Sequence, residues 1–190
     1  MPSEKDVALS RRALLGAFAA VGTIAAAPAQ AGLFGFLKGA GDVRRIKMYS
    51  TRTGEMVDTI YWIEGQYIPE AMKEINWFMR DWRRDEVIEY DPRNIDIIAA
   101  TQRLLETNEP FNLLSGYRSA ATNAMLRQRN RGVASKSYHI KGMAADLKLR
   151  GRSVSQIASA AQACNSGGVG RYYRSSFVHV DCGPIRTWKR

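Results

Sequence analysis

The sequence predicts a single α+β domain in which helices pack on an antiparallel sheet. Three observations lead to this prediction. The chain has 190 residues, of which 45% are apolar, enough for one core of ordinary size. A hairpin pattern and two segments with helical spacing occupy the first part of the globular region. Short alternating strands dominate the last part, and this separation of helices from strands is typical of α+β folds.

The first predicted element is a β-hairpin. Segments 45–50 (R-I-K-M-Y-S) and 56–63 (M-V-D-T-I-Y-W-I) alternate in polarity and flank the turn sequence T-R-T-G-E. A helix is predicted over 69–84, which begins with proline and has apolar residues at helical spacing. A second helix is predicted to begin at Pro92 or Asn94.

The rest of the chain alternates short strands with two further helices. A serine precedes the second of these helices and is a plausible N-cap. The predicted elements are a strand over 113–117, a helix over 120–129, a polar loop over 131–138, a strand over 144–149, a helix over 153–164, a strand that follows the glycines 167–170, and a last strand over 177–181.

The first 31 residues have the pattern of an export signal. A polar start with Ser10-Arg11-Arg12 precedes an apolar run over 13–27, and Ala29-Gln30-Ala31 is a small-x-small cleavage site. The arginine pair resembles a twin-arginine signal, which implies the twin-arginine export machinery as a partner and a periplasmic or cell-envelope location. An ordinary secretory signal is the alternative. The apolar run has about 15 residues where a span needs about 20, so no stable membrane span is expected after cleavage.

The sequence therefore divides into three parts. Residues 1–31 are expected to be a cleaved signal, 32–43 a glycine-rich flexible lead-in, and 44–190 the folded domain. The net charge of +10 and the pI near 9.9 favour an acidic partner, which could be nucleic acid, anionic lipid or an acidic cell-wall polymer. Export argues against nucleic acid. The sequence does not specify an oligomeric state.

The chain has two histidines, and each lies in an unusual context. His139 stands in S-Y-H-I-K-G-M-A-A-D-L, seven residues before Asp146, and His179 stands in F-V-H-V-D-C-G. If the strands that carry Asp146 and His179 are neighbours, the three side chains can meet. Two imidazoles and one carboxylate are a common catalytic zinc triad, in which the fourth position holds a water whose pKa falls to about 7. A histidine that is simply packed or exposed is the alternative.

Four segments carry a resemblance to a known family. They resemble the zinc D-Ala-D-Ala metallopeptidases (peptidase family M15), and more narrowly the branch of exported murein endopeptidases of the endopeptidase K type. The likeness spans about residues 45–188. The segments are S-G-Y-R-S at 115–119, S-Y-H-I-K-G-M-A-A-D at 137–146, G-G-V-G-R-Y at 167–172 and F-V-H-V-D at 177–181.

The resemblance implies a fold, a reaction and a set of site residues. The implied fold is that of the hedgehog and D-Ala-D-Ala peptidases. The implied reaction is zinc-dependent cleavage of peptide cross-links in peptidoglycan, with Zn²⁺ held by His139, Asp146 and His179. By the same resemblance, Arg118 stabilises the negative charge that develops on the carbonyl oxygen. A D-alanyl-D-alanine carboxypeptidase and a non-catalytic, zinc-containing wall-binding module are the alternatives.

The general base is the point at which the family pattern is broken. Ser176 and Phe177 stand where several branches have a base, and neither can accept a proton from water. Strand alternation places Asp181 on the same face as His179, so Asp181 is predicted to be the base or a partner that orients an imidazole. Cys182 is expected to face the opposite way. Cys164 and Cys182 could form a disulfide or stay as buried thiols.

Overall fold

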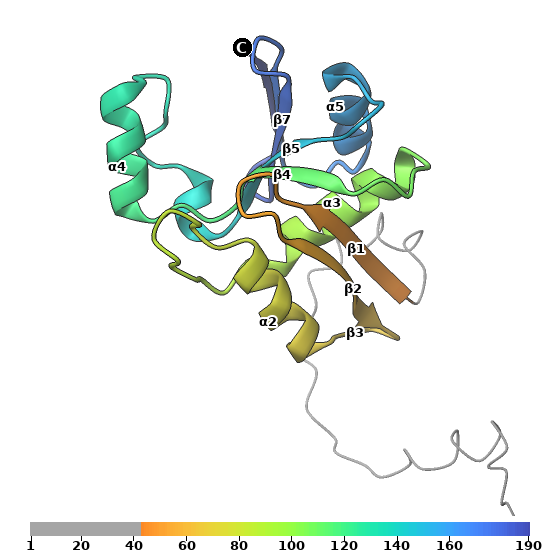
Figure 1. The fold of residues 1–190 in the computed structure, drawn as a ribbon. Coiled ribbons are helices and arrows are strands. Elements are labelled where there is room, and N and C mark those ends of the chain that lie inside the picture. The colour runs from red at the N-terminus through yellow and green to blue at the C-terminus, as the bar shows by residue number, and fades with distance from the viewer. Residues whose placement is uncertain (1–42) are drawn as a thin grey trace, which may run out of the picture. The chain divides into compact units, whose positions relative to one another are not determined.

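The computed structural model describes residues 43–190 (Figure 1). The predicted export signal and nearly all of the predicted lead-in lie outside the described residues. The strands are β1 (Val43–Tyr49), β2 (Met56–Ile63), β3 (Gln66–Tyr67), β4 (Phe111–Ser115), β5 (Ala144–Lys148), β6 (Gly168–Tyr172), β7 (Phe177–Asp181) and β8 (Arg186–Lys189). The helices are α2 (Pro69–Phe78), α3 (Pro92–Leu104), α4 (Ala120–Arg129) and α5 (Val154–Ala163), with a 3₁₀ turn, η2 (Tyr138–Lys141).

The strands form a single mixed sheet in the order β3-β2-β1-β4-β5-β7-β6-β8. The α+β class is confirmed, but the prediction of an antiparallel sheet is only partly right. β1 pairs with β4 in parallel and β6 pairs with β8 in parallel, whereas the other neighbours are antiparallel. The first parallel pair follows from the long connection through α2 and α3. The second arises because the chain reverses direction twice between β6 and β8.

The N-terminal hairpin joins the same sheet as the later strands, so the strands are less segregated than predicted. Its register pairs Tyr49 with Met56, and Gly54 in the turn has a φ of +74°, which glycine adopts without strain. The strand β8 was missed altogether, because 177–181 was predicted to be the last strand. The four residues of β8 follow a short loop and carry no alternating apolar pattern.

Two helix boundaries show where local contacts overrule helical spacing. The predicted helix over 69–84 ends at Phe78, where the Arg80 amide donates to the Trp77 carbonyl (3.2 Å) in a tighter turn and the Arg80 side chain donates to the same carbonyl (3.0 Å). The Asp81 amide then donates to the carbonyl of Glu86 (2.9 Å) and turns the chain. By contrast, α4 has the predicted bounds, and Ser153 caps α5 in a full capping box.

A buried ionic cluster attaches the N-terminal hairpin to α3. The Asp96 carboxylate accepts hydrogen bonds from Arg44 (2.8 Å), Tyr61 (2.9 Å) and Tyr67 (2.6 Å). The Arg44 guanidinium also lies 4.2 Å above the ring of Trp62. The carboxylate is thereby satisfied entirely by donors, as a buried charge requires.

Helix α3 packs against β1, β7 and α5, and α5 packs against β6 and β7. Cys164 and Cys182 are both buried free thiols, which decides between the two states predicted for them. Among residues 43–190, no helix combines the length and apolar character needed to cross a bilayer.

Candidate metal centre

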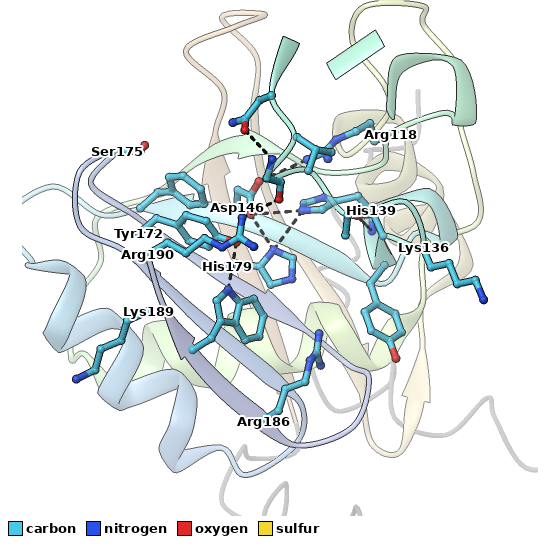
Figure 2. Close-up of a pocket in the computed structure, with 18 residues that line it drawn as sticks. Arg118, Lys136, His139, Asp146, Tyr172, Ser175, His179, Arg186, Lys189 and Arg190 are labelled. Carbon is cyan, nitrogen blue, oxygen red and sulfur yellow. Dashed lines mark hydrogen bonds and ion pairs between the residues drawn. The ribbon is translucent and has the colours of Figure 1, made fainter. Parts of the chain in front are cut away.

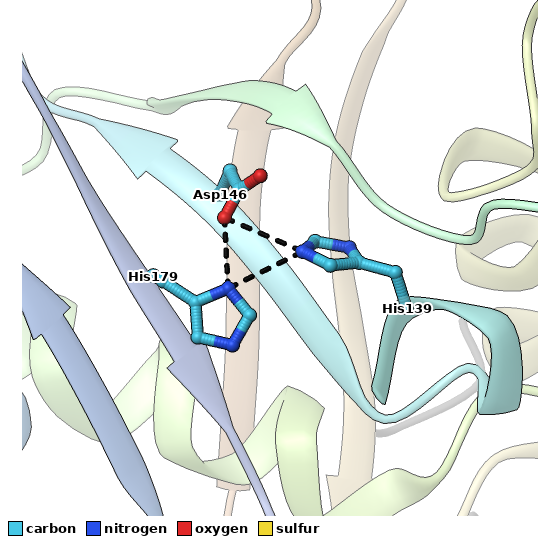
Figure 3. A group of neighbouring side chains, drawn as sticks. All are labelled: His139, Asp146 and His179. Atoms are coloured by element: carbon cyan, nitrogen blue, oxygen red, sulfur yellow. Dashed lines mark hydrogen bonds and ion pairs between the residues drawn. The ribbon is translucent and has the colours of Figure 1, made fainter. Parts of the chain in front are cut away.

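Three side chains from neighbouring elements converge on one point (Figure 3). Asp146 on β5 and His179 on β7 are direct partners across the antiparallel pair, so their side chains leave the sheet on the same face. His139 lies on the turn η2, immediately before β5. Gly142 ends this turn with a φ of +64° and so returns the chain to the sheet beside His179.

The spacing of the three ligand atoms fits a tetrahedral metal ion. His139 Nε2 lies 3.2 Å from His179 Nδ1, His179 Nδ1 lies 2.9 Å from Asp146 Oδ1, and His139 Nε2 lies 3.4 Å from Asp146 Oδ1. Metal–ligand bonds near 2.0–2.1 Å at tetrahedral angles would separate the ligand atoms by about 3.3 Å. The three side chains could therefore hold a metal ion.

Each histidine also has a partner on its far ring nitrogen. His139 Nδ1 lies 2.7 Å from the carbonyl oxygen of Gly116, which can only accept, so Nδ1 carries the proton and Nε2 presents a lone pair. His179 Nε2 lies 3.0 Å from Asp181 Oδ2, which leaves Nδ1 as the free nitrogen. Partners of this kind fix the orientation and tautomer of metal ligands.

Asp181 is fully buried and well satisfied. Besides His179, it accepts two hydrogen bonds from Arg186 (2.7 and 2.9 Å) and one from the amide of Gly183 (2.9 Å). It meets His179 on the ring edge opposite the free nitrogen, so it faces away from the point where the ligands converge. Of the two roles predicted for Asp181, this position favours the orienting one and argues against the base.

Two glycines on β6 leave room for the side chains that contact Asp181 and His179. A Cβ on Gly168 would lie 2.3 Å from the Arg186 guanidinium, and a Cβ on Gly170 would lie 2.4 Å from the ring of Trp188. Trp188 in turn packs against His179, with 5.3 Å between the ring centroids. Because these two glycines have no side chain, Arg186 can reach Asp181 and Trp188 can pack against His179. Arg186 and Trp188 had no motif of their own in the sequence.

Arg118 lies beside the converging ligands. Its guanidinium is 3.7 Å from Asp146 Oδ2 and donates to Asn123 (3.2 Å) and Ser115 (3.4 Å), while its Nε has no hydrogen-bond partner among residues 43–190. The backbone amide of Arg118 donates to the carbonyl of His139, which ties the two segments together. The structure thus brings Arg118 to the same site as the three ligands.

The electrostatics of the group follow from its burial and its charges. Burial would raise the pKa of Asp146, but both histidines act against it and hold that pKa far below its usual range. Burial, helped by the nearby charges of Arg118 and His179, lowers the pKa of His139 against the opposing effect of Asp146. Burial would also lower the pKa of His179, yet its hydrogen bonds to Asp146 and Asp181 raise it to about 9. The two carboxylates thus outweigh burial and favour positive charge beside Asp146, which is a proton on His179 in the metal-free protein and which a bound cation would replace.

The site opens into a pocket of about 570 Å³ (Figure 2). One wall is aromatic, formed by Tyr172 stacked on Phe177 together with Trp188, whose indole donates to the Tyr172 hydroxyl (3.2 Å). Cys182 does not belong to the ligand group, as strand alternation predicted. Asp146 has the one carboxylate side chain among the described lining residues.

Comparison with known proteins identifies one family consistently. The family model described as peptidoglycan L,D-endopeptidase MepK matches residues 38–188. The peptidoglycan L,D-endopeptidase MepK of Escherichia coli (strain K12) is 43% identical over 145 residues, which are 76% of this chain and 80% of that protein. The probable peptidoglycan L,D-endopeptidase MepK of Haemophilus influenzae is 39% identical over 147 residues, 77% of this chain and 79% of that protein.

A solved structure is also similar in part. The crystal structure of Serratia marcescens L-Ala D-Glu endopeptidase ChiX aligns with 50% of this chain and 68% of that chain, at 20% identity and a TM-score of 0.35. A likeness at that level carries neither fold nor function.

Proposed function

This chain belongs to the peptidoglycan L,D-endopeptidase MepK family, and from that premise we propose that it is a zinc enzyme whose metal is held by His139, Asp146 and His179. The resemblance found in the sequence is confirmed at the level of the family. The enzyme is a peptidase that acts on peptidoglycan, and membership favours the endopeptidase over the carboxypeptidase and the non-catalytic module.

The observation that carries the proposal is the spacing of the three ligand atoms. Separations of 2.9–3.4 Å between two ring nitrogens and a carboxylate oxygen match the edges of a tetrahedron around zinc. Two nitrogens and one oxygen suit Zn²⁺ among the common divalent ions. In such a site, zinc supplies an acidic water at neutral pH and polarises the peptide carbonyl.

We assign Arg118 to the charge that develops on the carbonyl oxygen. Its guanidinium lines the pocket, lies 3.7 Å from Asp146 Oδ2, and is held in place by Asn123 and Ser115. A preorganised donor of this kind favours the transition state, in which the oxygen becomes negative, over the ground state.

We assign Asp181 to the orientation of His179. Its carboxylate accepts from His179 Nε2 and is fixed in turn by Arg186. The lone pair of His179 Nδ1 is thereby held toward the other two ligands. A carboxylate that only orients a ligand should affect the affinity for metal more than the rate of the loaded enzyme.

The proposal is tested by digestion of cross-linked peptidoglycan with the purified enzyme, with zinc and with a chelator. Mass spectrometry of the released muropeptides should show chelator-sensitive loss of cross-linked dimers and a matching gain of monomers. One bound zinc per chain without any product would instead support a wall-binding module. Loss of terminal D-alanine from stems that stay cross-linked would support the carboxypeptidase.

We also propose that residues 1–31 direct export by the twin-arginine route to the periplasm and are then removed. The support is the sequence pattern around Arg11 and Arg12, together with a substrate that lies in the cell envelope. Replacement of both arginines by lysine should leave full-length protein in the cytoplasm. Continued export of that variant would point to the general secretory route.

A further inference from the structure

Arg186, the first residue of β8, holds the carboxylate that lies behind His179. Its guanidinium donates to both oxygens of Asp181, at 2.9 Å to Oδ1 and 2.7 Å to Oδ2. Asp181 Oδ2 also lies 3.0 Å from His179 Nε2, so the arginine and the imidazole share one carboxylate oxygen. A two-point contact of this kind fixes the plane of a carboxylate as well as its position.

Two aromatic rings hold the guanidinium of Arg186 in turn. Its central carbon lies 5.1 Å from the ring centroid of Tyr138 and 4.9 Å from that of Trp188. Contacts at such distances favour the charged guanidinium. Tyr138 directly precedes His139, and Trp188 packs against His179 with 5.3 Å between the ring centroids. Arg186 therefore contacts neighbours of both proposed histidine ligands.

Two glycines leave the space that the ion pair occupies. Gly168 lies opposite Arg186 in the pairing of β6 with β8, and a Cβ there would overlap the guanidinium and lie 2.5 Å from Asp181 Oδ2. A Cβ on Gly183 would lie 2.5 Å from the ring of Tyr138 and 2.9 Å from Asp181 Oδ1. A side chain at either position would therefore disturb the contacts of Asp181.

Burial makes Asp181 depend on Arg186. The Asp181 side chain is 0% exposed, whereas Arg186 lines the pocket (Figure 2) and its side chain is 39% exposed. A buried carboxylate without a counter-charge is strongly destabilised. A metal-bound imidazole is neutral, so His179 does not supply that counter-charge when an ion is bound. Arg186 is then the one remaining cation within 4 Å of the Asp181 carboxylate among residues 43–190.

Arg186 could affect a bound metal ion in two opposite ways. As a positive charge in the same pocket it repels a cation, so its removal would strengthen metal binding. As the residue that fixes Asp181, it keeps His179 Nδ1 directed at the other ligands, so its removal would weaken metal binding. Water screens the partly exposed guanidinium, whereas the contact with the buried carboxylate is direct. The second effect should therefore be the larger one.

We propose that Arg186 is a positioning residue of the metal centre, which holds His179 in its metal-binding orientation through Asp181. The inference rests on the proposed function, because it takes His179 as a ligand. It extends that proposal to a side chain beyond the last of the four family-like segments, and it makes β8 a part of the metal centre.

The test measures zinc affinity by competition with a chromogenic chelator, on the purified protein and three variants. Arg186→Met keeps the apolar length of the side chain and removes its charge and its donors. Arg186→Lys keeps the charge but lacks the planar pair of donors. Gly168→Ala retains the arginine, and its Cβ displaces the guanidinium from Asp181.

Arg186→Met should weaken zinc binding about tenfold, at the lower end of the range for partners of metal-binding histidines, because Arg186 acts through one further residue. Arg186→Lys should lose less. Gly168→Ala should also weaken binding, and its effect should not add to that of Arg186→Met in the double variant, because both changes break the same contact. At saturating zinc, kcat should stay within about tenfold of the wild-type value.

Arg45→Met is the matched control. Arg45 also pairs with an aspartate, Asp58, but the pair lies on the N-terminal hairpin. The variant removes the same charge from the same kind of pair, and zinc affinity should not change. Nuclear magnetic resonance adds a readout of orientation. The Nε2 proton of His179 should exchange slowly with water in the zinc-loaded wild type and in Arg45→Met, and faster in Arg186→Met.

Unchanged zinc affinity in folded Arg186→Met would overturn the inference, and tighter binding would show that Arg186 acts only as a repelling charge. An equal loss in Arg45→Met would also overturn it, since net charge would then explain both results. If Arg186→Met fails to fold in urea titrations of the metal-free protein, Arg186→Lys and Gly168→Ala decide by the same measurements.

The proposed function can fail separately. A wild type that binds zinc through these ligands but cuts no peptidoglycan would remove the endopeptidase assignment, and the titrations would still decide the role of Arg186. A wild type that binds no zinc would remove both.

Discussion

Two mostly buried carboxylates, Asp96 and Asp146, lie in the same sheet-and-helix framework but in opposite chemical surroundings. Asp96 accepts from Arg44, Tyr61 and Tyr67, so every neighbour donates to it. Asp146 instead faces the lone-pair nitrogens of His139 and His179 at 2.9–3.4 Å. A buried carboxylate that accepts hydrogen bonds from all its neighbours has its charge compensated within the protein. A buried carboxylate that lies beside imidazole nitrogens needs a proton or a metal ion between them.

The hydrogen-bond partners of the two carboxylates, and not their degree of burial, distinguish a structural site from a functional one. Asp96 is 4% exposed and the Asp146 side chain is 14% exposed, so burial hardly distinguishes them. Their hydrogen-bond partners do distinguish them: Asp96 has only donors around it, and Asp146 has two imidazoles. Changes at the Asp96 cluster should therefore act on stability, and changes at the Asp146 group should act on metal binding and turnover.

The largest effect is expected for His139→Ala. The variant removes one of the three proposed ligands, and activity should fall at least about ten-thousandfold, which corresponds to about 5.4 kcal/mol in the activation free energy. Metal content measures the first loss and muropeptide release the second. The thermal midpoint of the metal-free protein should change little, and near-normal turnover would show that the metal lies elsewhere.

The complementary change, Asp96→Ala, should destabilise the fold and spare the chemistry. It leaves the buried Arg44 without a counter-charge, which should lower the free energy of unfolding by about 3–5 kcal/mol. Urea denaturation measures this, and the specific activity of the folded fraction should be unchanged. Asp58→Ala is the control, because its pair with Arg45 is exposed and should contribute no more than about 1 kcal/mol.

Arg118→Lys sharpens the contrast between two buried arginines. Arg44 gives a direct 2.8 Å bond to its carboxylate, but Arg118 lies 3.7 Å from Asp146 and retains an unpartnered Nε. Loss of its planar donor set should lower kcat by about 10²–10³-fold with metal content unchanged. If only KM rises, Arg118 stabilises the bound substrate and the transition state equally, so it contributes to binding and not to the chemical step.

The smallest expected effect separates the two roles of Asp181. In Asp181→Asn, an orienting partner should weaken metal affinity by about 10–100-fold while leaving kcat at saturating zinc within about tenfold. A general base would give the reverse result, with affinity retained and kcat lost at every zinc concentration. Competition titration with a chromogenic chelator, followed by rates at saturating zinc, distinguishes the two.

The residues on β5 and β7 were predictable from the sequence because their chemistry is local. Strand alternation, the turn at Gly142 and four short motifs are enough to group His139, Asp146 and His179. The end of α2 was not predictable, since the residues after Phe78 keep helical spacing while the Asp81 amide bonds to the distant carbonyl of Glu86 and turns the chain.

Contacts between distant segments account for most of what was missed. The Asp96 cluster joins residues that lie 29 to 52 positions apart, and no periodicity marks them. The ion pair between Asp181 and Arg186 spans a loop and depends on a parallel strand that the pattern did not indicate. The glycines at 168 and 170 were interpreted as a turn. In the structure they lie on β6, where a side chain would collide with Arg186 or Trp188.

The direct pairing of Asp146 with His179 across β5 and β7 has a practical consequence. The backbone ladder of the sheet holds these two side chains, and the hydrogen bond to the Gly116 carbonyl holds His139, the third proposed ligand. These contacts hold the three side chains in position without a bound ion. We therefore expect that one divalent ion can be exchanged for another without a change of fold. Stripped protein should accept Co²⁺ in place of Zn²⁺, and the visible absorption of cobalt would then report the coordination geometry directly by colour.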